Sequence, residues 1–184
     1  TASPEYIFGL HFDRIDAAAF EVHLFTLHYN LAEKYKFEDN CWNGICAQES
    51  FFHLFDADTN DIRRKSLLFG FQYFDDGSPV VDPSYEKFNP QDPTYRDPDG
   101  APLNLTPHVN MLEPKCLRQA GARVAKYPFI VGSDRYTSND MPIFRLGEIY
   151  LMKAELLLRK GDAAGALEYV NNLRVRASAT PLTE

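Results

Sequence analysis

The sequence lacks a segment long and apolar enough to cross a membrane. Crossing a bilayer takes about 20 consecutive apolar residues, and the longest apolar stretch, 149–158, is interrupted by Lys153 and Glu155. A signal peptide is also missing, as expected of a mature or cut chain. The sequence therefore predicts no membrane helix.

Positive charge is scarce as well. The chain holds 19 lysines and arginines against 26 aspartates and glutamates, which gives a net charge of −7. A negative surface repels the phosphates of nucleic acid, and the basic run 63–65 is too short to reverse this. We therefore expect no nucleic-acid partner.

Cysteine and histidine are few, and neither is spaced as metal ligands are. Of the three cysteines, Cys41 and Cys46 lie close together and Cys116 is remote, and the five histidines include no His-Glu-x-x-His pattern. We expect no metal and no cofactor. Cys41 and Cys46 either form a disulfide, in an oxidising compartment, or remain free thiols, and the sequence leaves both readings open.

The motifs of catalysis are absent too. No serine sits in a Gly-x-Ser-x-Gly elbow, and there is no glycine-rich phosphate loop. Carboxylates are plentiful, but nothing marks a pair placed for glycoside hydrolysis. We therefore expect a protein that is not an enzyme. A hydrolase stays as a third hypothesis, which turnover of any glycan would establish.

What the chain does have is enough apolar material for a folded core. Its 184 residues are 45% hydrophobic and 14% aromatic, which is ordinary for a globular protein and too rich for disorder. No convincing boundary divides residues 1–184, so we expect one domain. The predicted class is α+β: irregular, loop-rich sheet elements packed on a tetratricopeptide-like helix pair at the C-terminus.

The predicted helix pair spans residues 141–178. The first helix is apolar on nearly every side and should therefore be buried on several sides. Gly161 ends it, and Asp162 can cap the second helix. One such unit cannot bury its own face, so the remaining part of the protein, or another chain, is expected to pack on it. The expected contact residues are Leu146, Tyr150 and Leu157.

The same stretch carries a polar motif. It reads R-x-x-E-x-x-L-M-x-A-E from Arg145, then G-D, A-L and N-x-x-R-x-R-A ending at Ala177. Weaker pieces precede it in order, at 4–8, 42–44, 61–64 and 121–127. In this order the pieces resemble the SusD/RagB family, over nearly the whole chain. The family's lipoprotein signal, long helical N-terminal half and final helical segment are missing, so we expect a fragment of a SusD-like fold.

The resemblance implies a function. Members of this family are lipid-anchored proteins at the outer surface of Bacteroidetes-type cells, which bind glycans, or in one branch peptides, and close over a SusC-like TonB-dependent transporter. The implied chemistry is binding by aromatic stacking and hydrogen bonds, for polysaccharide utilisation. A hypothesis of another class is a helical-repeat scaffold whose helix pair docks protein only. Glycan binding by the intact protein discriminates between the two.

The best binding candidate is the loop around Trp42 and Asn43. The only tryptophan of the chain lies there beside an amide and a glycine. Sugars have flat C–H faces that stack on aromatic rings and hydroxyls that pair with amides. The alternative is that Trp42 is simply buried, as large aromatic residues commonly are. Neighbouring aromatic residues that can extend the platform are Tyr29, Tyr35 and Phe37.

Residues 56–61 resemble the start of a calcium loop. An EF-hand needs glycine at its sixth position and glutamate at its twelfth, and these are Asp61 and Leu67 here. We therefore expect a polar turn in which Asp61 pairs with Arg63.

The remaining elements follow from local patterns. Alternation predicts a strand at 5–13. Aromatic and β-branched content favours an extended segment at 22–29, although its alanine-rich lead-in suits a helix. Proline-rich residues 82–107 are expected to form a long surface loop. Other expected elements are a loop at 36–47, a short helix at 48–55, a strand at 66–74 with a turn at Asp76-Gly77, and a short strand within 103–112.

Overall fold

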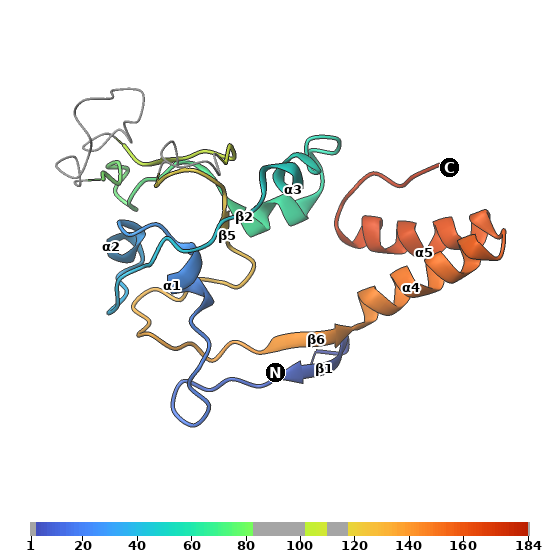
Figure 1. The fold of residues 1–184 in the computed structure, drawn as a ribbon, viewed down its shortest axis with the longest axis horizontal. Helices are drawn as coiled ribbons and strands as arrows, with labels where there is room; N and C mark the ends of the chain where they lie inside the picture. Colours follow the sequence, from blue (N-terminus) through green and yellow to red (C-terminus); the bar gives the residue numbers. More distant parts are fainter. Residues whose placement is uncertain (1–2, 83–101, 110–117, 184) are drawn as a thin grey trace.

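The fold has two parts, a body of short elements and a long helix pair, joined by a β-ribbon (Figure 1). The computed structural model describes residues 3–82, 102–109 and 118–183. The elements, in chain order, are β1 (Tyr6–Leu10), α1 (Val22–Thr26), α2 (Leu31–Tyr35), α3 (Glu49–His53), the 3-10 helix η1 (Ile62–Ser66), β2 (Leu67–Leu68), β3 (Gly70–Phe71), β4 (Asn104–Leu105), β5 (Arg123–Val124), β6 (Met141–Arg145), α4 (Leu146–Arg159) and α5 (Ala163–Arg176).

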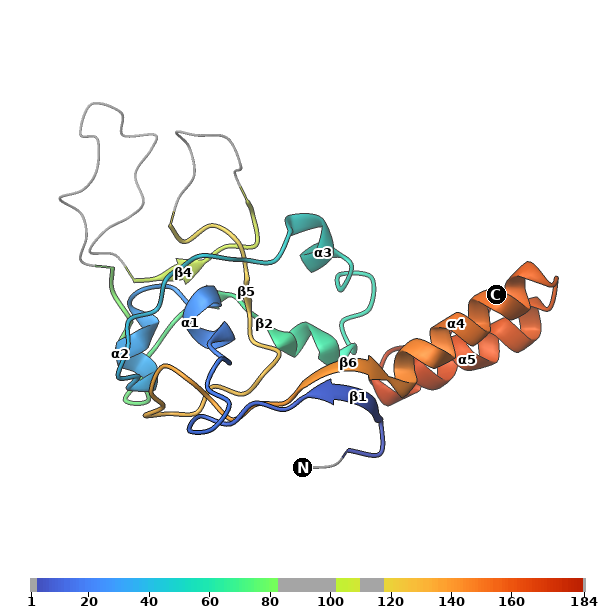
Figure 2. The same cartoon turned by 60° about the horizontal axis from the view of Figure 1, so that its bottom comes forward.

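The sheets are small and antiparallel. Within the described ranges, β1 pairs with β6, β2 with β5, and β3 with β4, each as a two-stranded sheet. In the β1–β6 ribbon, Tyr6 lies opposite Arg145 and Leu10 opposite Met141. Figure 2 shows this ribbon leading from the body into α4. The predicted mixture of loop-rich sheet elements and a C-terminal helix pair is confirmed.

The core of the body lies between α1, α2 and the β3–β4 region. Leu24 in α1, Leu27 directly after α1 and Leu31 at the start of α2 are fully buried. They pack against Val80 and Leu105. The prediction of an extended segment at 22–29 is wrong for residues 22–26, which form α1. Aromatic and β-branched residues favour a strand only beside a partner strand, and here α1 instead buries His23, Leu24 and Thr26.

Two other predicted elements need correction. The segment at 66–74 is not one strand, because Gly70 has a φ of +80° that breaks it into β2 and β3. The helical stretch was also placed too early, since Met141–Arg145 forms β6 and α4 begins at Leu146. The β1 partner strand is 131 or more residues away in sequence, so local pattern gave no sign of this pairing.

Other predictions agree with the structure. The expected strand near the N-terminus is β1, and the expected short helix is α3. The turn at Asp76-Gly77 is closed by a hydrogen bond from the amide of Gly77 to the carbonyl of Phe74, 3.0 Å long. Part of the segment 103–112 forms β4. Most of the predicted proline-rich loop, residues 83–101, lies outside the described residues, as do Cys116 and residues 110–117.

The helix pair forms as its sequence indicates. Gly161 ends α4 with a φ of +83°, and the Asp162 carboxylate caps α5 by accepting from the amide of Gly165 at 2.8 Å. Ala154 and Ala166 are the buried residues of the two helices. Tyr150 packs against Tyr169, with ring centroids 5.4 Å apart. The two helices therefore pack against each other closely, with small alanines buried between them and a tyrosine pair beside them.

Much of α4 remains uncovered. Ile149, Met152 and Leu156 are 43%, 48% and 56% exposed, and their spacing puts them on one face away from α5. Of the contact residues expected from the sequence, Leu146 is also exposed, whereas Tyr150 and Leu157 are half-buried. None of the described helices combines the length and apolar character needed to cross a membrane.

Polar contacts attach the end of α5 to the body. The Asp58 carboxylate accepts from the amide of Thr180 at 2.5 Å and from Arg174 at 3.2 Å. The amide of Ile62 donates to the carbonyl of Ala177 at 2.9 Å. Residues 56–61 thus form the predicted polar turn, in which the Asp61–Arg63 pair is present at 2.5 Å, and the turn serves additionally as a docking point for α5.

Candidate functional site

The loop that carries Trp42 is held against α1 by main-chain hydrogen bonds. The amides of Trp42, Asn43 and Gly44 donate to carbonyls of 24, 27 and 25, at 2.7, 2.9 and 2.8 Å. The last carbonyls of a helix have no partner within the helix, and in the five-residue α1 the loop satisfies them. The loop therefore has a defined position although it has no regular secondary structure.

Asn43 fixes the loop on its other side. Its φ of +52° lies in the left-handed region, which asparagine tolerates better than most residues. The side-chain nitrogen donates to the carbonyl of Arg118 at 2.8 Å, and the side-chain oxygen accepts from Arg123 at 2.6 Å. Both polar ends of Asn43 are therefore occupied by the protein itself.

Arg123 is the centre of this arrangement. It is 2% exposed and donates also to the carbonyls of Ala120, Gly121 and Arg118 at 2.7–2.9 Å. Gly121 has a φ of +84°, and a Cβ there would overlap the Cys46 side chain. The Gly-x-Arg pattern at 121–123, weak as a motif, thus has a structural role: a buried guanidinium that gathers carbonyls and the Asn43 amide.

The Trp42 ring is half-buried at the rim of the core. It packs against the buried leucine cluster of α1 and α2. Phe25, which is 42% exposed, meets it edge-on with ring centroids 4.5 Å apart and an interplanar angle of 79°. The guanidinium of Arg135 lies 5.4 Å from the ring centroid. Trp42 therefore contributes both to packing and to a surface of mixed aromatic and cationic character.

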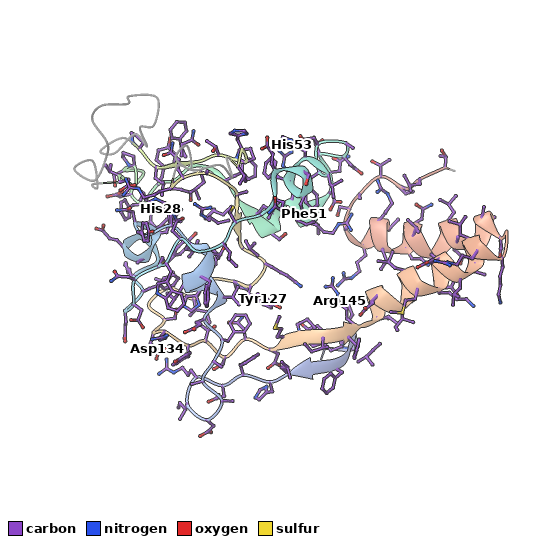
Figure 3. The ribbon with its side chains drawn as sticks, in the orientation of Figure 1. His28, Phe51, His53, Tyr127, Asp134 and Arg145 are labelled. Atoms are coloured by element: carbon purple, nitrogen blue, oxygen red, sulfur yellow. The ribbon has the colours of Figure 1, made fainter. Side chains whose placement is uncertain are left out.

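Arg135 belongs to a loop that the sequence did not single out. Its Nε donates to the carboxylate of Glu21 at 2.8 Å, and its guanidinium lies 5.5 Å from the Tyr136 ring. Figure 3 shows the preceding residue, Asp134, at the edge of the body away from the helix pair. Phe25, Glu21 and Arg135 carried no local signal, because only the fold brings them to Trp42.

The other predicted aromatic residues form a separate group. Tyr35 and Phe37 stack with centroids 5.5 Å apart and an interplanar angle of 20°, and Tyr35 also meets Phe129. Tyr29 is 46% exposed and touches the ring of His28. Across the part of the chain that the structure describes, no ring contact joins Trp42 to these residues. The predicted platform thus divides into a Trp42 surface and a Tyr35–Phe37 stack.

A buried polar cluster lies deeper in the body. His28 is fully buried, with its Nε2 3.5 Å from Asp82, and Arg118 lies 3.3 Å from the same carboxylate oxygen. Burial lowers the pKa of His28 to about 4, against the opposing pull of Asp82. The imidazole is therefore neutral at pH 7. Because the cluster is enclosed, we assign it to structure rather than to binding.

The two cysteines among the described residues, Cys41 and Cys46, are free thiols. Cys41 is buried and Cys46 half-buried, and no disulfide joins them. Burial raises the pKa of the Cys41 thiol to about 12, so it is protonated and unreactive at neutral pH. The alternative of a disulfide between Cys41 and Cys46 is therefore wrong.

The described residues also enclose hollows away from Trp42. A cavity of about 10 Å³ lies beside His23 and Tyr127, which is room for about one water. An open hollow of about 370 Å³ follows β1 and reaches His11 and Asp140. Trp42 lines neither of them. Among the described residues, no group of His, Cys, Asp or Glu side chains is arranged to hold a metal ion.

Comparison with known proteins bears on the family. The C-terminal motif region, residues 118–184, matches the SusD family. The fold of the chain resembles a SusD-like protein from Bacteroides fragilis NCTC 9343, with a TM-score of 0.50 and 18% sequence identity over 98% of this chain. The resemblance read from the motif is thereby confirmed. The chain spans 37% of the length of that SusD-like protein, and no curated protein matches it.

Proposed function

We propose that this SusD-like chain belongs to a nutrient-binding protein of the cell surface, which captures oligosaccharide without turning it over. In this proposal the parent protein is lipid-anchored in the outer membrane and delivers its ligand to a SusC-like TonB-dependent transporter. The family segment at 118–184 supports the broad class. The glycan as ligand, the transporter as partner and the location are the parts that we add.

The observation that carries the proposal is the Trp42 surface. A partly buried indole ring lies beside the aromatic Phe25 and the ion pair of Arg135 with Glu21. Aromatic faces stack on the C–H faces of sugars, and charged groups bond sugar hydroxyls. The main-chain bonds of the loop and the Asn43 contacts hold the ring in place before ligand arrives, which lowers the entropic cost of binding.

Tyr29, Tyr35 and Phe37 remain part of the proposed ligand surface as an outer region. The exposed ring of Tyr29 is the one best placed to meet a longer oligosaccharide. The stacked Tyr35–Phe37 pair packs against the core, so its contribution is expected to be smaller. Asn43 we place behind the surface, because its side chain is already hydrogen-bonded.

The test is glycan binding by the wild-type chain and by Trp42→Ala. Isothermal titration against a panel of soluble oligosaccharides should show binding that Trp42→Ala weakens several-fold or abolishes, since stacking contributes on the order of 1 kcal/mol or more. Phe51→Ala, at an exposed ring on α3 (Figure 3), is the matched control and should bind normally. Binding of extended peptides in place of glycans would favour the peptide branch of the family.

A second candidate function is protein docking by the helix pair. The observation that favours it is the uncovered α4 face of Ile149, Met152 and Leu156. An apolar helix face of this kind marks a site where another surface packs. We propose that the remaining part of the same protein, or another chain, covers it. The two candidate functions are compatible if the helix pair supports the fold while the Trp42 surface binds ligand.

A further inference from the structure

The ion pair beside Trp42 has hydrogen-bonding capacity to spare. Nε of Arg135 donates to Oε2 of Glu21 at 2.8 Å. Within the described residues, the two Nη groups of Arg135 make no hydrogen bond, and Oε1 of Glu21 accepts none. The Arg135 side chain is 49% exposed and that of Glu21 22% exposed. One short edge therefore offers free N–H donors and a free carboxylate oxygen side by side.

This edge lies directly at the aromatic surface. The Arg135 guanidinium is 5.4 Å from the centroid of the Trp42 ring, and Phe25 borders the same ring. A hydroxyl group both donates and accepts a hydrogen bond. Two adjacent hydroxyls of a sugar can therefore accept from Arg135 and donate to Glu21, while the C–H face of the sugar lies against the surface that Trp42 forms with the 42% exposed Phe25.

The local charge decides between neutral and acidic sugars. The positive charge of Arg135 is already balanced by Glu21, and Asp39 also contributes a negative field at the guanidinium. Arg14, 3.8 Å from Asp134, is likewise paired. An acidic sugar would thus find the charge of Arg135 already balanced by Glu21, and the carboxylates of Glu21 and Asp39 would repel its own negative charge. A neutral sugar meets only donors and acceptors.

We propose that Trp42, Arg135 and Glu21 form a subsite for a neutral sugar with two adjacent free hydroxyls. The inference rests on the proposed function and adds the substrate class and two ligand-contacting residues. Arg135 supplies donors through Nη, and Glu21 supplies the acceptor through Oε1. The ion pair holds both groups in position, so little side-chain freedom is lost on binding.

The experiment compares hexasaccharides of each class. Maltohexaose, cellohexaose and xylohexaose are the neutral probes, and hexagalacturonate is the acidic one. Titration calorimetry should show that at least one neutral probe binds more tightly than hexagalacturonate. Arg135→Gln and Glu21→Gln should each weaken that neutral probe by about tenfold, the typical effect of losing a charge-assisted hydrogen bond. Glu21→Gln should also reduce the difference in affinity between the neutral and acidic probes, because a negative charge is removed.

The chain offers a matched control pair. Glu155 and Arg159 form an exposed ion pair at 2.5 Å on α4, remote from Trp42. Arg159→Gln and Glu155→Gln should leave affinity unchanged, which separates the subsite from general charge effects. Thermal unfolding of every variant checks that the fold is intact. Arg135→Lys, which keeps the charge without the planar fork, should bind with intermediate affinity.

The outcomes separate this inference from the proposed function. If Trp42→Ala abolishes binding of a neutral probe while Arg135→Gln and Glu21→Gln bind normally, the subsite is overturned and the glycan-binding function stands. Tighter binding of hexagalacturonate than of every neutral probe also overturns it. If the wild-type chain binds no glycan of the panel, the proposed function and the subsite both fail.

Discussion

The buried guanidinium of Arg123 donates to the side-chain oxygen of Asn43 at 2.6 Å, across 80 residues of sequence. This bond ties the Trp42 loop to the segment 118–123, which also supplies the carbonyls that Arg123 gathers. The proposed ligand surface at Trp42 therefore depends on residues behind it that need not touch ligand. The contact has a convenient reporter, because Trp42 is the only tryptophan of the chain.

Replacing Asn43 by alanine should loosen this loop. The substitution removes two side-chain hydrogen bonds and leaves an alanine at a φ of +52°, so we expect a loss of about 2 kcal/mol of unfolding free energy. Trp42 emission should shift to longer wavelength, and acrylamide should quench it more strongly. Asn43→Gly keeps the backbone conformation and should recover part of the stability without restoring the fluorescence. Unchanged emission in both variants would contradict the role.

The pH dependence of stability should report His28. Its pKa in the folded state, about 4, lies below the unfolded value of 6.5 because of burial. The unfolded chain therefore binds the proton more readily, and stability falls as the pH drops from about 6.5 toward 4. Charged groups around the ring are Asp82, which opposes this shift, and Arg118 and Arg123, which support it. Urea unfolding at several pH values should show the loss, and His28→Gln should flatten the curve in this window.

The buried His23 gives a check on that assignment. Burial also lowers the pKa of His23. Replacing His23 by a neutral residue should therefore remove a separate part of the pH dependence of stability. A curve in His28→Gln that is as steep as that of the wild type would show that other groups dominate.

The Asp58 contacts predict how the helix pair is held. Asp58→Ala removes the acceptor for Thr180 and Arg174, and an unfolding free energy lower by about 1–3 kcal/mol is expected. Limited proteolysis should then cut near 177–183 more quickly than in the wild type. Asp76→Ala, in a turn remote from α5, serves as the control for losing a surface carboxylate. Equal cleavage rates in both variants would count against the docking role.

Calcium should have no specific effect on the same turn. The carboxylates of Asp58 and Asp61 are bonded to Arg174 and Arg63, and the EF-hand glycine and glutamate are missing. We expect sub-millimolar calcium to leave the melting temperature unchanged. A rise of several degrees that Asp58→Ala removes would show the turn to be a metal site.

The uncovered α4 face should control association. Ile149, Met152 and Leu156 are exposed apolar residues on one side of α4, and such a face favours self-association or capture of a partner. Sedimentation of the chain should show species larger than the monomer. Changing the three residues to glutamine should yield monomer with little loss of stability, since none of them is buried. A wild-type chain that sediments as a stable monomer would contradict this.

Some features of the fold could be read from local sequence. Gly161 and Asp162 mark the turn of the helix pair, because a left-handed C-cap and a side-chain N-cap depend on residues within the turn itself. The polar turn with its Asp61–Arg63 pair is equally local. The strand at β1 followed from alternation, although its partner did not.

The secondary-structure predictions were wrong where contacts with residues distant in the sequence determine the structure. The side chains of residues 22–26 suit a strand, yet these residues lie in a helix that buries Leu24 beside Leu27 and Leu31. Met141–Arg145 was read as helix, and pairing with β1 makes it a strand. In both cases the local preference amounts to a fraction of a kcal/mol per residue, and tertiary contacts exceed it.

The sequence by itself determined the family resemblance of its C-terminal part. The spacing of Arg145, Glu148, Asn171 and Arg174 carries this resemblance, residues 118–184 match the SusD family, and the lone tryptophan marked a candidate surface. Only the tertiary structure decided what surrounds that tryptophan. Glu21, Phe25, Arg123 and Arg135 come from segments far apart in the chain, and no periodicity or motif can specify such a meeting. It follows from packing of the core, which closes loops over long sequence separations and fixes which side chains face each other.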